Sequence, residues 1–176
     1  MRITGGVYRG RQIQCPKGVI RPAMDRMRES LFSILGPLDG YSFLDVFSGS
    51  GIIGIEAASR GAEPVVLVEM DKIKKPVMQK NISFVETEIT PFFMPAQTYL
   101  RSCRRTFDYI FLDPPFPLNR KKSFIEMVAK KQVLKDDGTL LIHYPKEDAL
   151  PDEIGTLVCT DTRAYGRSTV KFFRYK

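Results

Sequence analysis

The sequence predicts an α/β fold with a mostly parallel sheet of seven strands that ends in a C-terminal antiparallel hairpin. From residue 42 onward, short apolar stretches alternate with segments of helical periodicity. This alternation indicates right-handed βαβ crossovers and a parallel sheet that is covered on both faces. At the C-terminal end, two β-rich stretches follow one another without a helix between them, so we expect them to pair antiparallel.

The elements of this sheet are expected in a regular order. Five apolar stretches predict the parallel strands, at 42–47, 64–68, 89–94, 107–112 and 139–143. The segments between them predict helices at 52–60, 72–84, 96–105 and 121–131. The final hairpin is expected from 156–163 and 169–175, which are connected through Tyr165-Gly166-Arg167.

A short extension precedes the sheet. Residues 1–18 predict a β-hairpin, because extended residues surround Gly5-Gly6 and the Arg9-Gly10-Arg11 turn. Residues 24–35 predict a helix with an apolar stripe at helical spacing. Gly36-Pro37 ends that helix.

The composition predicts a cytoplasmic globular domain. The 176 residues are enough for one compact domain with a full hydrophobic core. No apolar run approaches the roughly 20 residues that cross a bilayer, and no apolar segment opens the chain as in a signal peptide. The cysteines include no C-x-x-C pair, so we expect reduced thiols and neither disulfide nor metal; they are Cys15, Cys103 and Cys159.

Positive charge is concentrated at the start of the chain. Residues 1–28 contain seven basic residues and one acidic residue, so they carry +6 of the formal net charge of +7. A basic stretch on a nearly neutral body favours binding to nucleic acid, and a solvated basic face is the alternative. We therefore expect a nucleic-acid-binding extension at 1–38 and the main domain at 39–176. The candidate contacts are Arg2, Arg9, Arg11, Arg21, Arg26 and Arg28.

A glycine-rich loop follows the first predicted strand. Gly49, Gly51 and Gly54 match G-x-G-x-x-G between a strand and a helix, where glycines permit a tight turn and a close approach of ligand to backbone. Glu69 ends the second strand, about 20 residues further on, where an acidic side chain can accept hydrogen bonds from two ribose hydroxyls. Together they favour a nucleoside-bearing cofactor, either a dinucleotide or S-adenosylmethionine.

Asp45 favours S-adenosylmethionine over a dinucleotide. It stands at the end of the first strand, just before the glycines. A carboxylate there would repel a pyrophosphate but suits a ligand that presents an ammonium and a sulfonium charge. The alternative is an aspartate that only caps the loop by bonding its backbone.

The fourth predicted strand delivers Asp113-Pro114-Pro115-Phe116 to the same edge of the sheet. The prolines fix φ and donate no hydrogen bond, so the segment is expected to be extended and rigid. An exocyclic base amine attacks poorly, because its lone pair is delocalised into the ring. Asp113 and the Pro114 carbonyl can accept its two N–H bonds and orient the nitrogen, while Phe116 offers a stacking face. An ordinary strand-ending turn is the alternative.

With these motifs the chain resembles the RsmD family, bacterial enzymes that methylate N2 of one guanine in 16S rRNA. The resemblance covers nearly the whole chain, and its basic N-terminal motif is the part that narrows the match to this family. It is carried by Arg2-Ile3-Thr4-Gly5-Gly6, Arg9-Gly10-Arg11, Arg21-Pro22, Asp25-Arg26, Arg28-Glu29-Ser30-Leu31-Phe32, Leu44-Asp45-Val46-Phe47-Ser48-Gly49-Ser50-Gly51, Val68-Glu69-Met70-Asp71 and Asp113-Pro114-Pro115-Phe116.

The resemblance implies a Rossmann-like, class I methyltransferase that binds S-adenosylmethionine and acts on rRNA in a small ribosomal subunit. We expect the protein to be a monomer. The resemblance also implies that Met70 packs beside the adenine and that Ala96 contacts the adenine amine. The family usually has Asp or Asn where this chain has Pro95, and more often Tyr where it has Phe116. The full set of expected cofactor contacts is Asp45, Phe47, Gly49, Ser50, Gly51, Gly54, Glu69, Met70, Ala96 and Asp113.

Three further basic or titratable residues lie near this site in the predicted topology. Arg120 and Lys121 follow the catalytic segment and are candidate RNA-phosphate contacts. We interpret His143, at the end of a predicted strand, as a structural histidine. The alternatives for function are an adenine-N6 methyltransferase acting on DNA or RNA, a nicotinamide-dependent oxidoreductase and a non-catalytic RNA-binding assembly factor.

Overall fold

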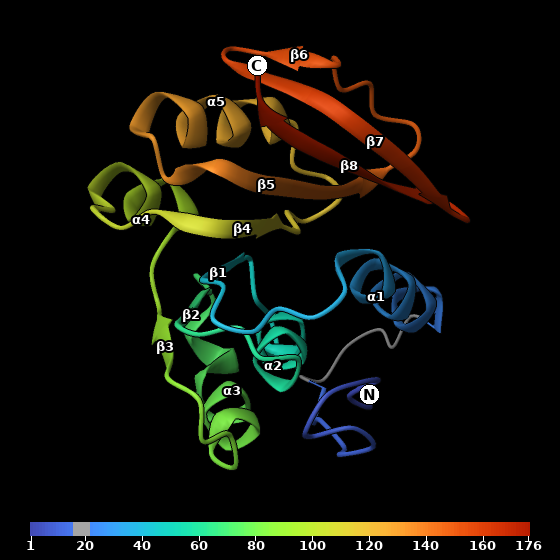
Figure 1. The fold of residues 1–176 in the computed structure, drawn as a ribbon, viewed down its shortest axis with the longest axis vertical. Helices are drawn as coiled ribbons and strands as arrows, with labels where there is room; N and C mark the ends of the chain where they lie inside the picture. The colour runs from blue at the N-terminus through green and yellow to red at the C-terminus, as the bar shows by residue number, and fades with distance from the viewer. Residues whose placement is uncertain (16–21) are drawn as a thin grey trace.

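A computed structural model describes residues 1–15 and 22–176 as one twisted sheet with helices on both faces (Figure 1). The strand order is β3-β2-β1-β4-β5-β8-β7-β6. Within the described part of the chain, no helix is long and apolar enough to cross a membrane.

The parallel half of the sheet contains all five strands predicted for it. They are β1 (Phe43–Val46), β2 (Val65–Val68), β3 (Ile89–Phe92), β4 (Phe107–Leu112) and β5 (Leu134–Pro145). Each neighbouring pair among β3, β2, β1, β4 and β5 is parallel. Every residue of β1 and β2 is buried, which explains why these strands do not alternate between apolar and polar residues and are apolar except at Asp45.

The antiparallel half of the sheet differs from the prediction by one strand. The expected hairpin forms from β7 (Leu157–Tyr165) and β8 (Ser168–Tyr175), and β8 pairs antiparallel with β5. An additional strand, β6 (Glu153–Ile154), pairs with the start of β7, so the sheet has eight strands rather than seven. Two residues are too few to show a period-2 pattern, and this is why the sequence did not predict β6.

The helices agree with the predicted segments except at their ends. They are α1 (Pro22–Leu35), α2 (Ile52–Ser59), α3 (Lys75–Ile82), α4 (Ala96–Ser102) and α5 (Lys121–Lys131). The segment predicted as one helix at 72–84 begins instead with a separate 3₁₀ turn, η1 (Lys72–Lys74). Pro76 lies in the first turn of α3, the one part of a helix where a missing N–H costs nothing.

The predicted N-terminal β-hairpin is reduced to a single bridge. Arg2 and Gln12 form an isolated antiparallel bridge, and the Ile3 amide donates to the Arg11 carbonyl at 3.0 Å. The chain therefore reverses direction as expected, but no regular strands form within residues 1–15, the described part of this segment. The two described stretches of residues 1–38 nevertheless pack firmly, because Ile3, Ile13, Phe32 and Leu38 are buried in the same apolar cluster as α2.

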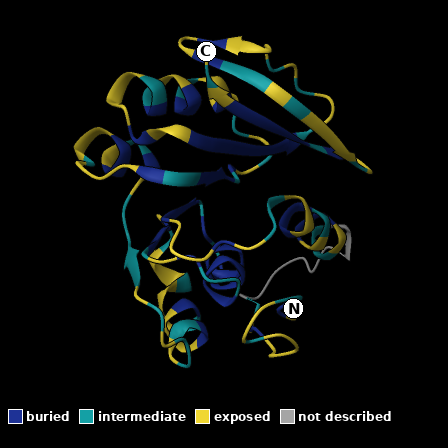
Figure 2. Cartoon of the chain, viewed as in Figure 1, coloured by how far each residue is buried: buried dark blue, intermediate teal, exposed yellow. Residues whose placement is uncertain are grey.

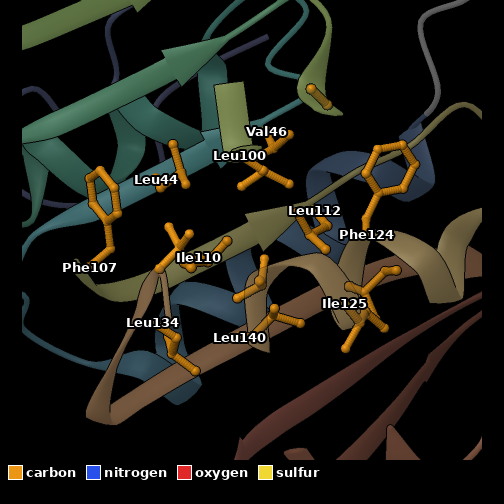
Figure 3. Packing of buried hydrophobic residues seen from close by; sticks show 14 of the residues in the cluster. Leu44, Val46, Leu100, Phe107, Ile110, Leu112, Phe124, Ile125, Leu134 and Leu140 are labelled. Carbon is orange, nitrogen blue, oxygen red and sulfur yellow. The ribbon is translucent and has the colours of Figure 1, made fainter. Parts of the chain in front are cut away.

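The core lies in two apolar layers, one on each face of the sheet (Figure 2). Helices α4 and α5 cover one face, and Figure 3 shows Leu100, Phe124 and Ile125 from these helices against Ile110 and Leu112 of β4. Helices α1, α2 and α3 cover the other face. This double cover leaves the carboxyl ends of the parallel strands as the place where polar groups gather.

Candidate active site

The candidate site lies at the carboxyl ends of neighbouring strands in the parallel half of the sheet. The glycine loop follows β1, Glu69 follows β2 and Asp113 follows β4. Since these three strands are adjacent in the order β2-β1-β4, their ends lie side by side. This edge is where open α/β sheets bind ligands.

The glycine loop has a left-handed backbone at three positions. Phe47, Gly49 and Gly51 have φ values of 68°, 57° and 85°. For glycine this conformation is free of strain, but for Phe47 it costs about 1–3 kcal/mol. The Phe47 ring packs edge-on against Phe124 of α5, with ring centroids 5.1 Å apart. A strained residue held in place by packing is typical of a functional loop.

Ser48 and Ser50 hold the loop to its surroundings. The Ser48 hydroxyl donates to the Asp45 carbonyl at 2.6 Å and accepts the Val68 amide at 2.9 Å, so it links β1 to β2. Ser50 is buried, and its carbonyl accepts a hydrogen bond from the Asn81 side chain of α3. The loop is therefore rigid before any ligand binds, which lowers the entropy cost of binding.

Gly54 permits α2 to lie close to the sheet. A Cβ atom at this position would be 2.2 Å from Leu67 Cδ2, so a larger residue would push the helix away. The Gly54 amide donates to Asp45 Oδ2 at 3.1 Å. The structure thus contains the loop-capping contact that was the alternative role for Asp45.

The buried environment of Asp45 disfavours the charged form of its side chain. Burial raises the pKa of Asp45 to about 8, the carboxylates of Asp113 and Glu69 add to the increase, and the Gly54 amide opposes it. A carboxylate under-compensated in this way is stabilised by any cation that binds nearby. Loop capping and attraction of a cationic ligand are compatible roles for one side chain.

Glu69 is held in a fixed orientation. It is 7% exposed; its Oε2 accepts the Gly49 amide at 2.7 Å and its Oε1 accepts the Asp71 amide at 2.9 Å. Lys74 lies 3.6 Å from Oε2. A carboxylate offers about four acceptor positions, so each oxygen keeps a lone pair for a further donor such as a ribose hydroxyl.

The predicted adenine contacts follow two neighbouring strands, β2 and β3. Met70 directly follows Glu69 and is 64% exposed, so its side chain is accessible to a ligand. Ala96 is the first residue of α4, the helix that follows β3, and its side chain is buried. Pro95 precedes it at the N-cap position and provides no side-chain cap.

The Asp113-Pro114-Pro115-Phe116 segment leaves β4 at the same edge. The Asp113 amide donates to the Val46 carbonyl at 3.2 Å, which keeps the segment beside β1. Pro114 is buried and Pro115 is exposed, while the carboxylate of Asp113 is 22% exposed. The segment thus presents a partly accessible acceptor next to the glycine loop, as the sequence predicted.

Lys121 has a different place from the one predicted. Its side chain is buried, and its Nζ donates to the carbonyls of Phe116 and Leu118 at 2.7 and 2.8 Å. It also pairs with Asp148. The prediction of an RNA-phosphate contact is wrong for Lys121, because its charge is used to hold the segment that follows Asp113. Arg120, its neighbour, is exposed.

His143 belongs to the site, which the sequence interpretation missed. Its Nδ1 lies 2.8 Å from Asp113 Oδ1, and its ring centroid lies 5.3 Å from that of Phe116. The signal was available in principle. The strand that contains His143 was expected beside the one that ends at Asp113, and the carboxyl ends of parallel strands meet at one edge.

The N-terminal motif is bound to α2 through Glu56. This buried carboxylate accepts both the amide and the hydroxyl of Thr4, at 3.0 and 2.7 Å, and the amide of Gly5 at 2.9 Å. It also forms ion pairs with Arg28 and Arg60. The prediction of a nucleic-acid contact is therefore wrong for Arg28, whose guanidinium is 3% exposed and neutralises Glu56.

The other predicted nucleic-acid contacts of the extension are exposed or lie outside the described residues. Four of the predicted contacts are exposed in the extension: Arg2, Arg9, Arg11 and Arg26. The Arg11 guanidinium lies 4.6 Å above the ring of Phe84. Arg21 lies outside the described residues. Exposure permits contact with phosphates, and the contact itself stays a prediction.

No metal site is built into the described residues: among them, no group of three or more His, Cys, Asp or Glu side chains is arranged to hold an ion. The edge carboxylates Asp45 and Glu69 instead accept hydrogen bonds from backbone amides, and Asp113 lies within hydrogen-bond distance of His143.

The strand order, the glycine loop after β1 and the acidic residue after β2 define the fold of a class I methyltransferase. Comparison with known proteins agrees with this assignment of the fold. The family model described as "Conserved hypothetical protein 95" matches residues 1–174, and the chain belongs to this family, as the resemblance to RsmD enzymes predicted.

The relatives are similar over most of their length. YlbH of Bacillus subtilis, whose name assigns it provisionally to the rRNA methyltransferases, is 32% identical over 186 residues, covering 99% of this chain and 98% of that protein. Ribosomal RNA small subunit methyltransferase D of Escherichia coli K12 is 32% identical over 154 residues, covering 86% and 78%. The solved structure of Escherichia coli yhhF, provisionally named a methyltransferase, has a TM-score of 0.90 at 29% identity, covering 100% and 98%.

Proposed function

We propose that this protein transfers a methyl group from S-adenosylmethionine to the exocyclic N2 amine of a guanine in 16S rRNA. The observation that carries the proposal is the meeting of the Asp113-Pro114-Pro115-Phe116 segment with the glycine loop and Glu69 at one edge of the sheet. The substrate class comes from the family, since its relatives in Escherichia coli and Haemophilus influenzae are named ribosomal RNA small subunit methyltransferase D.

The residues at this edge fit the cofactor. Glu69 keeps a lone pair on each oxygen for the two ribose hydroxyls, and exposed Met70 offers an apolar surface beside the adenine. Asp45 carries a carboxylate whose raised pKa makes a nearby cation favourable. When bound, the cofactor supplies a methyl group activated by the sulfonium.

The residues of the catalytic segment suit an amine nucleophile. Asp113 and the Pro114 carbonyl accept hydrogen bonds from the two N–H groups, which turns the nitrogen lone pair toward the methyl group. Phe116 stacks against the extruded base. Lys121 fixes the Phe116 carbonyl, so that the stacking residue and the acceptor keep their relative positions.

A further proposal concerns the RNA surface. We expect the exposed arginines of the extension, Arg2, Arg9, Arg11 and Arg26, together with Arg120, to contact phosphates of the subunit. We expect the protein to act as a monomer in the cytoplasm, where ribosomal subunits assemble.

The test is methyl transfer from radiolabelled S-adenosylmethionine to three substrates from a strain that lacks the enzyme: small ribosomal subunits, naked rRNA and duplex DNA. The proposal predicts label in rRNA. Label in DNA alone would retain the amine chemistry and overturn the substrate. Absence of label, together with measurable cofactor binding, would support a non-catalytic assembly factor.

A further inference from the structure

The single histidine of the chain lies at the centre of the candidate site. His143 is in β5 and is 1% exposed. Leu112 of β4 and Ile142 of β5 are partners in the parallel register, so the next residues along the two strands are Asp113 and His143. The register of the sheet therefore places this histidine beside the proposed amine acceptor.

The contact requires a proton on Nδ1. An ionised carboxylate can only accept hydrogen bonds, so a separation of 2.8 Å between His143 Nδ1 and Asp113 Oδ1 is favourable when Nδ1–H donates. The donation uses one oxygen of Asp113 and leaves the second oxygen as an acceptor for the target amine.

Asp113 needs such a donor because of its neighbours. The charge of Asp113 contributes to the raised pKa of Asp45, as does that of Glu69, so negative charge on Asp45 and Asp113 is close enough to repel. Within the described residues, His143 is the only side chain that forms a hydrogen bond or ion pair with Asp113. Without it, repulsion and rotation about the side-chain bonds would move the carboxylate away from a single orientation.

His143 also contacts the residue proposed to stack on the base. Its ring is tilted by 60° to that of Phe116, at a centroid distance of 5.3 Å. One side chain therefore sets the position of the hydrogen-bond acceptor and supports the stacking face. Both must be correct together for the amine to lie in line with the methyl group.

Stability alone does not account for a histidine at this position. Its Nε2 is buried and has no hydrogen-bond partner among the described residues, and a buried unpaired polar atom is destabilising. Polar groups that weaken the fold are expected at functional sites, where activity offsets the loss.

We propose that His143 is a positioning residue for methyl transfer, whose Nδ1–H holds the Asp113 carboxylate in the orientation that accepts the target amine and whose ring supports Phe116. The inference rests on the proposed function. It goes beyond it by assigning the orientation of the catalytic acceptor to a residue outside the Asp-Pro-Pro-Phe segment.

The kinetic test compares His143→Leu, which removes the donor, with His143→Asn, whose side-chain N–H lies close to the position of Nδ1. We expect His143→Leu to lower kcat by about tenfold to a hundredfold, with the KM for cofactor changed by less than about twofold and Tm not lowered. His143→Asn should recover most of kcat. Tyr144→Phe is the matched control, since Tyr144 is buried in the same strand and faces the opposite layer.

Each outcome is decisive. Wild-type kcat in His143→Leu, or equal losses in His143→Leu and His143→Asn, would overturn the positioning role. No transfer to rRNA by the wild-type protein would overturn the proposed function instead.

A measurement that needs no turnover completes the test. In protein labelled with ¹⁵N-histidine, the one imidazole should show a protonated Nδ1 whose resonance shifts in Asp113→Asn. An unprotonated Nδ1 at neutral pH would overturn the inference whatever the substrate is.

Discussion

Two regions of this protein bury carboxylates, and they do so in opposite ways. In the N-terminal anchor, Glu56 is surrounded by hydrogen-bond donors of Thr4 and Gly5 and by the guanidinium groups of Arg28 and Arg60. At the sheet edge, Asp45 is as deeply buried but accepts one backbone amide and faces two further carboxylates. The anchor compensates its charge fully, whereas the edge does not.

This difference distinguishes a carboxylate with a structural role from one with a functional role. A buried carboxylate with two cations holds elements together, and its removal damages the fold. A buried carboxylate without a cation is ready to receive one, which suits a site that binds a cationic cofactor. A carboxylate at the same burial can therefore have either of two roles, and the surrounding donors decide which.

The largest effect is expected from Glu56→Ala. Removing this carboxylate deprives buried Arg28 of one of its two carboxylate partners and releases the N-terminal motif from α2. We expect a loss of about 3–5 kcal/mol in the free energy of unfolding, measured by urea denaturation. Glu126→Ala is the control, because Glu126 forms an exposed ion pair with Lys122 and should cost at most about 1 kcal/mol. Equal losses in the two variants would contradict the anchor.

Asp113→Ala should have the next largest effect, and on activity rather than on the fold. Loss of the acceptor should lower kcat by at least about a hundredfold, while calorimetry with S-adenosylhomocysteine should give a Kd within about threefold of wild type. Wild-type turnover in this variant would remove Asp113 from catalysis.

Asp45→Asn should change how stability depends on pH. The pKa of Asp45 is about 8 in the folded protein and ordinarily 3.8, so the folded state binds the proton more tightly than the unfolded state. The wild-type protein therefore loses stability as pH rises between these values, and asparagine, which cannot ionise, removes that loss. The Tm of Asp45→Asn minus that of wild type should increase from pH 5 to pH 8.5. A difference independent of pH would show that Asp45 is as well compensated as the anchor.

The smallest effect is expected at the surface. Replacing Arg9 and Arg11 by alanine should weaken rRNA binding and reduce the slope of log K against log salt by about 1.5, since two phosphate contacts are lost. The same double change at Arg104 and Arg105, which are exposed before the start of β4, removes equal charge outside the extension. If the two pairs reduce the slope equally, the extension is not the RNA surface.

Much of the fold and part of the site could be predicted from the sequence. The alternation of apolar strands and helical segments, which depends on local periodicity, predicted the parallel strands and the final hairpin. The glycine loop and the Asp113 segment were recognisable because each follows a strand directly. Strand β6 was not, because two residues carry no pattern.

The remaining features depend on tertiary contacts that local patterns do not contain. Arg26 and Arg28 are equally basic in sequence, but only Arg28 faces Glu56 and is buried. Lys121 is buried because carbonyls of the preceding segment lie above it. His143 becomes a site residue through the register between β4 and β5.

The most direct test of the central claim is the identity of the methylated nucleoside. Small subunits from a strain that lacks the enzyme are labelled by the wild-type protein and by Asp113→Ala, and the rRNA is digested to nucleosides for mass spectrometry. The account predicts N2-methylguanosine with the wild-type protein and none above background with the variant. N6-methyladenosine, or a product that forms equally with Asp113→Ala, would contradict it.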